Sequence, residues 1–554
     1  MIRYCFTFYV LLLCFSQTQA QIPSEYAPTP PMGWNSWNSF GLDVTEVEVK
    51  ATVDYMAEHL LHFGWEYVVL DAGWYFPPEI TTRTGGMKKP PQWIDEYGRL
   101  IPDETKFPSS ANGAGFKPLA DYVHSKGLKF GIHIMRGIPW NAASQKTPIY
   151  GSTKSAGDVA DYNNVCQWSN IMVGLKMNDD ASQAYYNSLF KLYAEWGVDY
   201  IKVDDVAREF RNLDMIAIAK AIENSGREIV LSVSPGASPL NKASFFKEYT
   251  NMYRISNDLW DHWKFVPRQM DYCVQWYPHI TEGHWPDIDM LPFGKLRITG
   301  GDDWIASLLE DSYENIGNEL SRLTDIEKQT LMSLFCIFRS PLMFGGYFLE
   351  SDEFSLSLIT NQEALDVNQK SSNNKLLRKS GRLYTWVAEN PNTGDKYVAL
   401  FNLGETDQTM TFTLNELGIE SSGIIWDIWA ESDLGTFANE VSLEVAKHGS
   451  KLLKLSKTGE TSVMKASITN VNFAEVYPNP LGNTNHINID CSKTMYAEIN
   501  IYNQLGQLIE NIFSGLLTKG RNQITITNRE SIKGMHILKI NTNTEVLSFK
   551  LLFD

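Results

Sequence analysis

One short segment, residues 198–205, constrains the fold of this chain more than any other. It combines β-branched and aromatic strand formers with a lysine, and it ends in two carboxylates, Asp204 and Asp205. A helical pattern with apolar residues along one face precedes it and stops at Gly197. Helix, glycine, strand and carboxylate in this order indicate a β/α barrel, because such barrels carry their chemistry at the C-terminal ends of their strands.

The same alternation of helix and strand continues from about residue 30 to about residue 369. This alternation predicts an α/β fold, a (β/α)8 TIM barrel over residues 28–370. The main alternative is an open, doubly wound sheet, which is less favoured because no glycine-rich phosphate-binding turn follows the first strand. The expected strands cover residues 67–71, 128–133, 200–204, 228–232 and 253–256.

The pattern changes beyond residue 370. Segments of alternating polar and apolar residues, separated by turns rich in Asn, Pro and Gly, predict an antiparallel β-sandwich domain over residues 371–457. A polar stretch rich in Ser and Thr, residues 458–471, is typical of a linker. Residues 472–554 are again predicted to be all β.

The first twenty residues are predicted to be a signal peptide. Arg3 supplies a positive start, residues 4–15 form an apolar run too short to span a bilayer, and small residues precede a cleavage site after Ala20. No later segment is long and apolar enough to cross a membrane. An exported chain can form disulfides, and four cysteines beyond the signal peptide leave room for one or two bridges: Cys166, Cys273, Cys336 and Cys491.

Composition and motifs narrow the classes of function. The formal net charge of -17 argues against a nucleic-acid partner, because phosphate binding needs a basic surface. The sequence contains no CxxC or HExxH motif, so we expect no structural zinc, and nothing implies another metal or a cofactor. Most of the 16 tryptophans are expected in the core, and a few of them are expected to stack on sugar rings.

A second carboxylate, Asp258, follows the expected strand 253–256, and the pair suggests glycoside hydrolysis. A retaining glycosidase uses two carboxyl groups about 5–5.5 Å apart, one ionised and one protonated. Lys202 stands two residues before Asp204, on the same side of the strand, where its charge favours an ionised nucleophile. Arg254 stands four residues before Asp258, and the apolar residues after Asp258 favour a protonated acid.

Helix capping is the competing explanation for these carboxylates. Asp204 and Asp205 could cap a helix or form a turn after the strand, with Asp205 the better candidate for that role. Asp258 could cap a helix that starts at the next residue. The residues alone leave catalysis and capping about equally favoured.

Several motifs, in order, resemble glycoside hydrolase family 27, the α-galactosidase/melibiase group. The resemblance covers about residues 28–370 and rests on the following segments: Pro31–Asn38, Val69–Trp74, Tyr122–Ile132, Trp196–Asp204, Arg254–Asp258, His284–Leu291 and Ser340–Met343. It implies a TIM barrel, a retaining mechanism and an oligo- or polysaccharide substrate.

The resemblance also implies roles for individual residues around one sugar. Asp204 would be the nucleophile and Asp258 the acid/base. The other expected residues would contact the sugar: Lys202 and Arg254 by donating to its hydroxyls, Asp71 at the far side of the ring, Trp34 by packing against it, and His133 from a strand end in the pocket.

The sequence departs from the family pattern where the sugar is chosen. Ala72 stands where a second Asp is usual, His133 stands where a Tyr is usual, and the residue that selects the 2-substituent falls near Val233 and Ser234. Loss of a carboxylate from a site built on hydrogen bonds can shift specificity. We therefore expect an α-galactosidase first. The alternatives are an isomaltodextranase-like α-glucan hydrolase, an α-N-acetylgalactosaminidase, a β-L-arabinopyranosidase, or a carbohydrate-binding surface protein without activity.

The last eighty residues resemble the C-terminal sorting domain of type IX secretion in Bacteroidota. The matching segments are short but ordered: Val476–Pro480, Tyr502–Gly506, Gly534–Ile540 and Phe549–Leu551. The resemblance implies that the type IX secretion machinery is a partner, with export through the periplasm followed by secretion or surface attachment. A small β-sandwich binding module is the alternative.

Overall fold

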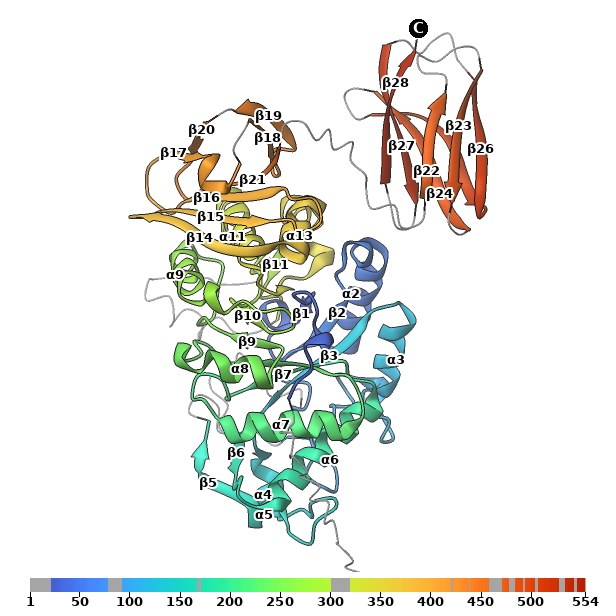
Figure 1. Cartoon of the computed structure of the whole chain (residues 1–554). Helices are drawn as coiled ribbons and strands as arrows, with labels where there is room; N and C mark the ends of the chain where they lie inside the picture. The colour runs from blue at the N-terminus through green and yellow to red at the C-terminus, as the bar shows by residue number, and fades with distance from the viewer. Residues whose placement is uncertain are drawn as a thin grey trace, which may run out of the picture. The chain divides into compact units, whose positions relative to one another are not determined.

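The computed structural model divides the chain into two compact units, residues 1–458 and 459–554 (Figure 1). The predicted signal peptide, residues 1–20, and nearly all of the predicted linker lie outside the residues that the structure describes. The described residues are 21–77, 92–166, 171–299, 319–419, 422–437, 439–457, 471–477, 484–491, 494–503, 507–527, 534–542 and 546–553.

Eight parallel strands form the centre of the first unit and confirm the predicted barrel. The last strand pairs with the first, and a parallel bridge between Leu291 and Phe344 joins the two edges of the sheet. In chain order the strands are β1 (Met32–Asn35), β2 (Tyr67–Leu70), β3 (Lys129–Met135), β7 (Tyr200–Asp204), β8 (Val230–Val233), β9 (Met252–Arg254), β10 (Trp285–Asp287) and β13 (Leu342–Phe344).

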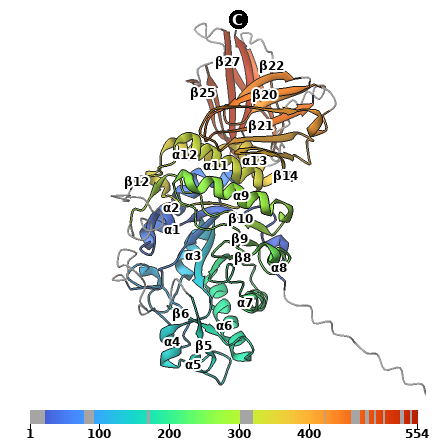
Figure 2. The same ribbon diagram turned by 90° about the vertical axis from the view of Figure 1, so that its left-hand side faces the viewer.

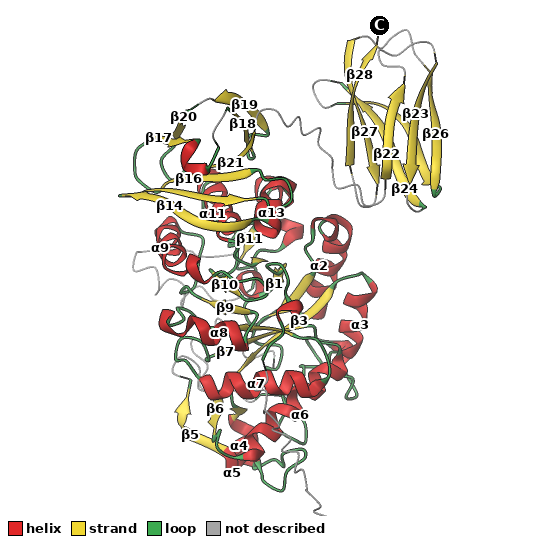
Figure 3. Ribbon diagram, viewed as in Figure 1, coloured by secondary structure: helices red, strands yellow, loops and turns green. Residues whose placement is uncertain are grey.

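Helices alternate with these strands around the barrel (Figure 3). Helix α6 shows why they begin and end where they do, because the Asp179 side chain accepts a hydrogen bond from the N–H of Ala181 and Gly197 ends the helix at a φ of 87°. The helices of this unit are α1 (Trp37–Phe40), α2 (Glu46–His59), α3 (Lys117–Ser125), α4 (Trp140–Gln145), α5 (Ala156–Val159), α6 (Asp180–Trp196), α7 (Asn212–Ser225), α8 (Ala243–Tyr249), α9 (Val266–Trp276), α11 (Asp325–Phe338), α12 (Glu353–Thr360) and α13 (Gln362–Lys370).

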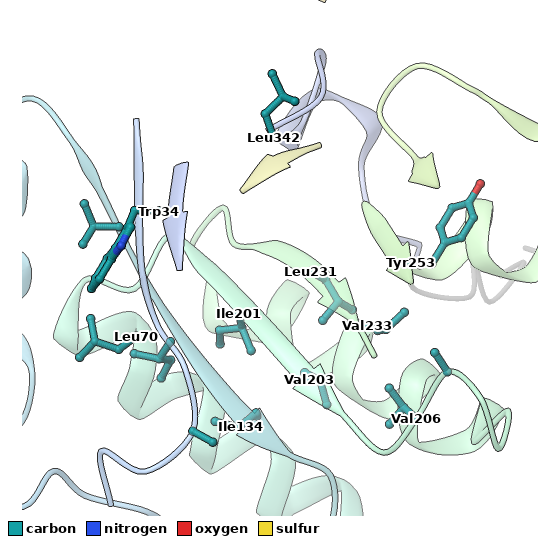
Figure 4. Close-up of a cluster of buried hydrophobic side chains, with 14 of the residues drawn as sticks. Trp34, Leu70, Ile134, Ile201, Val203, Val206, Leu231, Val233, Tyr253 and Leu342 are labelled. Atoms are coloured by element: carbon teal, nitrogen blue, oxygen red, sulfur yellow. The ribbon is translucent and has the colours of Figure 1, made fainter. Parts of the chain in front are cut away.

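Successive side chains along the barrel strands belong alternately to two buried clusters. Ile201 and Val203 of β7 belong to the large cluster that also contains helix residues, part of which is drawn in Figure 4. Tyr200 belongs to a separate cluster formed largely by barrel strands. Because side chains alternate along a strand, Lys202 and Asp204 share the face of Tyr200. They stand above this apolar layer at the C-terminal ends of the strands.

A small antiparallel sheet is inserted directly after β3. Its strands have the order β4–β6–β5, and α4 and α5 accompany it. The strands are β4 (Ile138–Pro139), β5 (Ala160–Val165) and β6 (Met172–Leu175). Because β4 begins only three residues after β3 ends, this insertion lies at the C-terminal end of the barrel, next to the end of β7.

An antiparallel β domain follows the barrel within the same unit, and α11 and α13 lie beneath it (Figure 2). A sheet of the order β14–β15–β16–β21–β18–β19 and a two-stranded sheet, β17–β20, enclose an apolar core of their own. Thr330 of α11 donates to the carbonyl of His448 at 2.8 Å. The strands are β14 (Ser372–Ser380), β15 (Leu383–Glu389), β16 (Lys396–Asn402), β17 (Gln408–Thr413), β18 (Gly423–Asp427), β19 (Ser432–Phe437), β20 (Glu440–Val445) and β21 (Ser450–Lys457), and a short pair, β11 (Lys295–Leu296) and β12 (Glu319–Leu320), lies earlier in the chain.

The described residues of the second unit form strands joined by loops. One sheet has the order β22–β23–β26 and the other the order β25–β24–β27–β28, with an isoleucine-rich core. The strands are β22 (Val471–Tyr477), β23 (Thr484–Cys491), β24 (Met495–Tyr502), β25 (Leu508–Leu517), β26 (Gly520–Thr527), β27 (Gly534–Thr542) and β28 (Val546–Phe553).

The disulfides that export would allow are not formed among the four described cysteines. All four are buried and take part in no disulfide: Cys166, Cys273, Cys336 and Cys491. Burial raises the pKa of Cys273 and of Cys336 above the ordinary thiol value. Within the described part of the chain, no helix combines the length and hydropathy that a membrane span requires.

Candidate active site

Five of the residues expected at the site meet at the C-terminal ends of neighbouring strands. His133 of β3 lies in register with Lys202 of β7, and Asp204 is the last residue of β7. Asp71 follows β2 directly, and Arg254 is the last residue of β9. Parallel pairing alone therefore brings together residues that are far apart in the sequence.

Asp204 is held in one orientation by its neighbours. The N–H of Asp205 donates to its Oδ1 at 2.7 Å, and Nε2 of His133 lies 3.5 Å from its Oδ2. Burial would raise the pKa of Asp204, but His133, Lys202 and the Asp205 N–H together outweigh burial and hold the pKa below its usual value. An ionised carboxylate of this kind is a suitable nucleophile.

Asp71 and Lys202 form a buried ion pair beside Asp204. Nζ of Lys202 donates to Oδ2 of Asp71 at 2.7 Å, and the Asn35 side chain donates to the same oxygen at 2.9 Å. The N–H of Ala72 donates to the other oxygen at 2.8 Å. Burial opposes ionisation of both groups, but their mutual attraction lowers the pKa of Asp71 and raises that of Lys202. Both groups therefore stay charged and can orient a polar ligand.

Arg254 bridges two carboxylates at the end of β9. Its Nη2 donates to Oδ1 of Asp258 at 2.9 Å, and its Nη1 lies 2.7 Å from Oδ1 of Asp289. The Asp258 side chain is 44% exposed, whereas that of Asp204 is 13% exposed. The two carboxylates therefore differ in environment: one is enclosed and the other is open to solvent, where it can exchange protons with water.

Asp289 supports the turn that carries Asp258. Its Oδ2 accepts a hydrogen bond from the N–H of Leu259 at 2.7 Å. Burial, with the charges of Asp258 and Asp287 added, raises the pKa of Asp289 to about 7 despite the attraction of Arg254. Its contacts are those of a residue that shapes the loop.

Helix capping does not explain the carboxylates. Helix α7 begins at Asn212, well after Asp204 and Asp205. The helical turn after Asp258 begins at Trp263, and its capping side chain is that of His262. Asp205 instead forms a turn with a φ of 64°, which is the other role that its sequence position allowed.

The expectation that Trp34 packs against a sugar is wrong. Trp34 pairs with Val68 on the outer side of the sheet, has no exposed surface and donates its indole N–H to the carbonyl of Gly346 at 2.8 Å. Trp37, three residues later, is only partly buried and packs against the cluster that contains Tyr200 and is formed largely by barrel strands. Its backbone N–H donates to Oδ1 of Asn35, the residue that also binds Asp71. The two tryptophans differ because Trp34 lies on β1, whereas Trp37 lies beyond the end of that strand, at the start of α1.

Arg136, which the motifs did not single out, is buried next to the site. Its guanidinium lies 2.9 Å from the carboxylate of Asp205. The only hint in the sequence was a charged residue directly after an apolar strand. His284 has a structural contact, since its Nδ1 lies 2.7 Å from the carbonyl oxygen of Thr250. The described residues contain no cluster of three or more His, Cys, Asp and Glu side chains suited to hold a metal ion.

Comparison with solved structures identifies the family. A family 27 β-L-arabinopyranosidase from Geobacillus stearothermophilus is 42% identical to this chain, with a TM-score of 0.75, and the match covers 79% of this chain and 99% of that one. This chain belongs to glycoside hydrolase family 27. The family model described as α-galactosidase A matches residues 29–144 and 173–305, and that of the α-galactosidase C-terminal β-sandwich matches residues 380–455. The chain is therefore a glycoside hydrolase with a carbohydrate substrate.

More distant family 27 members agree with this assignment. Alpha-galactosidase 2 of Arabidopsis thaliana is 27% identical over 450 residues, which are 80% of this chain and 93% of the plant protein. Alpha-galactosidase I of Mortierella vinacea is 23% identical, with a TM-score of 0.58, and the match covers 78% of this chain and 98% of the fungal one. The second of these similarities shows that the fold is shared.

The second unit has its own match. The model of the secretion system C-terminal sorting domain covers residues 475–554. This confirms the sorting domain that the terminal motifs indicated, with the type IX machinery as its partner. The family 27 enzyme is therefore exported to the outer surface or secreted.

Proposed function

We propose that this enzyme removes terminal α-D-galactosyl groups with retention of configuration, using Asp204 as nucleophile and Asp258 as acid/base. One observation carries this proposal: Asp204 is enclosed and has a lowered pKa, whereas the Asp258 side chain is open to solvent and bonded to Arg254. An ionised nucleophile and a carboxyl group able to exchange protons are the two groups that retention needs.

In the first step, Asp204 attacks the anomeric carbon. A bond forms between a carboxylate oxygen and C1 while the bond from C1 to the leaving oxygen breaks, and the electron pair of that bond goes to the leaving oxygen. Asp258, protonated at this stage, gives its proton to the same oxygen. The products are a free alcohol and a sugar ester of Asp204.

In the second step, water hydrolyses the ester. Asp258, now a carboxylate, takes a proton from the water while the water oxygen bonds to C1 and the Asp204 ester bond breaks. The two inversions restore the original configuration, and both carboxyl groups return to their starting protonation states. The exposure of Asp258 gives this water a route to the site.

The remaining polar residues would hold the sugar. Lys202 and Arg254 supply donors to its hydroxyls, and Asp71 accepts from those hydroxyls. The ion pair between Lys202 and Asp71 keeps both of these groups charged. We assign the sugar-facing aromatic role to Trp37 in place of Trp34, because Trp37 is only partly buried and is fixed near Asp71 through Asn35. His133 would act on the sugar through Asp204, which it faces.

A specific observation favours β-L-arabinopyranosides as a second substrate. A β-L-arabinopyranoside has the ring configuration of an α-D-galactoside but lacks the hydroxymethyl group. Ala72 offers no side-chain hydrogen bond where the family usually has a carboxylate, so recognition of an extra hydroxyl is weakened. The arabinopyranosidase from Geobacillus stearothermophilus is also more similar to this chain than the plant α-galactosidase is.

We also propose that the chain crosses the periplasm before the type IX step. A signal peptide at residues 1–20, cleaved after Ala20, would direct the first crossing, and residues 472–554 would direct the second. Residues 28–370, 371–457 and 458–471 would then be the catalytic domain, the β domain and the linker of the exported enzyme.

Hydrolysis of four aryl glycosides tests the function. The substrates are the p-nitrophenyl α-D-galactoside, β-L-arabinopyranoside, α-D-glucoside and N-acetyl-α-D-galactosaminide, each with wild type and Asp204→Asn. We expect wild type to hydrolyse the galactoside, and to hydrolyse the arabinopyranoside at a similar or lower rate. Both activities should be lost in Asp204→Asn. Turnover of the glucoside, or release of sugar only from an α-1,6-glucan, would move the substrate to the isomaltodextranase-like class. Sugar binding without any turnover would contradict the enzymatic role.

A further inference from the structure

Arg136 makes an unusual set of contacts for a residue outside the sugar pocket. It follows β3 directly and is only 2% exposed. Its backbone N–H donates to the carbonyl of Asp204 at 3.1 Å, and its Nε donates to the carbonyl of Asp205 at 3.0 Å. One residue thus binds two consecutive peptide carbonyls at the end of β7.

The guanidinium of Arg136 also binds two side chains. Nη2 lies 2.9 Å from Oδ2 of Asp205 and donates to Oδ1 of Asn164 at 2.9 Å. Asn164 belongs to β5 of the inserted sheet. The planar, forked shape of the guanidinium permits these simultaneous contacts, which the single ammonium group of lysine cannot reproduce. Arg136 therefore ties the end of β7 to the insertion.

These contacts fix an otherwise unfavourable turn. Asp205 has a φ of 64°, in the left-handed region that residues other than glycine rarely adopt. In this conformation its N–H donates to Oδ1 of Asp204 at 2.7 Å while its carboxylate points to Arg136. The turn thus orients Asp204 and directs the neighbouring carboxylate away from it.

Arg136 also balances charge beneath the site. Asp205 is buried beside Asp204, and both burial and the Asp204 charge raise its pKa, whereas Arg136 lowers it. Asp214, which accepts a hydrogen bond from the Tyr186 hydroxyl at 2.8 Å, is a second buried carboxyl group near Arg136, and burial raises its pKa. Loss of Arg136 would leave these carboxyl groups without its positive charge.

We infer that Arg136 is a positioning residue for the glycosylation step: it holds the Asp204–Asp205 turn so that the Asp204 carboxylate faces the anomeric carbon. This inference rests on the proposed role of Asp204 as nucleophile. Arg136 does not touch the sugar, so it affects the rate of attack and leaves sugar affinity nearly unchanged. A displacement of reacting atoms by about 1 Å can slow a reaction by about 100-fold.

Single-turnover kinetics with excess enzyme and an activated dinitrophenyl glycoside separate attack from binding. We expect Arg136→Met to lower the rate constant of dinitrophenolate release by about 100-fold, with the dissociation constant of the glycoside changed by less than about threefold. Arg136→Lys keeps the charge without the fork, so its rate should fall between those of Arg136→Met and wild type. Asp205→Asn in combination with Arg136→Met should not restore the rate, because the guanidinium hydrogen bonds to the Asp205 carbonyl and to Asn164 stay lost.

Arg227→Met is the matched control. Arg227 donates to the carbonyls of Val198 at 2.8 Å and Gly197 at 3.1 Å, just before β7 begins, and it pairs with Asp199. It is thus a second carbonyl-binding arginine, at the opposite end of the strand. We expect Arg227→Met to lower the melting temperature while its single-turnover rate stays within about twofold of wild type.

The outcomes distinguish this inference from the proposed function. A wild-type rate in Arg136→Met, or a loss found entirely in the dissociation constant, would overturn the positioning role while Asp204→Asn stays inactive. Restoration of the rate by Asp205→Asn would also overturn it, because charge balance alone would then account for the defect. Full activity of Asp204→Asn would instead reject the proposed nucleophile. If Arg136→Met does not fold, Arg136→Lys and Asp205→Asn decide the question by the same measurement.

Discussion

The two ends of strand β7 use the same residue types for different purposes. At its start, Asp199 lies between His124, whose Nε2 is 2.7 Å from Oδ2, and Arg227, which pairs with Oδ1. At its end, Asp204 lies near His133, and Arg136 is close by. Each end therefore has an aspartate, a histidine and an arginine.

The two aspartates differ in how many of their carboxylate oxygens are engaged in close hydrogen bonds and ion pairs. Both oxygens of Asp199 are engaged, since Oδ2 also accepts the N–H of Phe130 at 2.8 Å. Asp204 has one close hydrogen bond, and the nearby arginine bonds to Asp205 and the backbone instead. A carboxylate that is held but not saturated can still attack a substrate. This agrees with the general division of a β/α barrel into a stabilising face and a catalytic face.

The largest expected effect is at the end of the strand. Asp204→Asn should lower kcat/KM by about 10⁴-fold or more, because an amide is a poor nucleophile in place of the carboxylate. Hydrolysis of the preferred aryl glycoside measures it. Far-ultraviolet circular dichroism provides the folding control, and residual activity within about tenfold of wild type would mean that another group attacks the sugar.

Asp258→Ala should have a large effect that depends on the leaving group. We expect about a 10³-fold loss with a glycoside whose leaving group needs a proton and a much smaller loss in glycosylation with a dinitrophenyl glycoside, which does not. Added azide should restore turnover and yield the azide with retained configuration, because it can attack the glycosyl-enzyme without a base. Equal losses for both substrates would show that Asp258 does not donate the proton.

His133→Gln should move the pH dependence of activity. The nucleophile must be ionised, and activity is lost as the pH falls through the pKa of Asp204. Burial raises that pKa, and His133, Lys202 and the Asp205 N–H lower it to below the usual value. Removing His133 should therefore move the acid limb of the kcat/KM profile to higher pH, with about a tenfold loss near neutrality. An acid limb that stays in place would mean that His133 does not stabilise the ionised form.

Asp199→Asn should affect stability only. Burial would raise the pKa of Asp199, but His124, the Phe130 N–H and Arg227 outweigh it and lower the pKa. The resulting stabilisation is present above the pKa of the unfolded state and is lost as the pH falls through the lower folded-state pKa. We expect a loss of about 1–3 kcal/mol at neutral pH that shrinks in acid. Urea unfolding across this pH range measures the loss. A change in kcat would contradict the assignment of a purely stabilising role to the start of the strand.

The elements of the barrel were largely predictable because their signals are local. Strand β7 has the predicted bounds, and Gly197 ends the helix before it as expected. Asp204 and Lys202 could be placed on one face from their spacing. Contacts between distant residues were less accessible. The Lys202–Asp71 pair joins residues 131 apart, and only parallel pairing brings them together.

The incorrect expectations have physical reasons. The choice between Trp34 and Trp37 depends on which side of β1 Trp34 occupies and on where that strand ends, because Trp37 already belongs to α1, and a motif specifies neither. Export permits disulfides without requiring them, and here all four described cysteines are buried in different parts of the fold. Arg136 was not assigned because its partners lie on β5 and at the end of β7, on separate segments of the chain.

Trapping the glycosyl-enzyme tests most directly whether the end of β7 supplies the nucleophile. Wild type would be inactivated with a fluorinated galactosyl or arabinopyranosyl glycoside that reacts in the first step but hydrolyses slowly in the second. The labelled peptide would then be sequenced by mass spectrometry. The structure predicts one sugar per chain, attached to Asp204. A label on Asp258 or another carboxylate, or a turned-over substrate whose first product has inverted configuration, would contradict it.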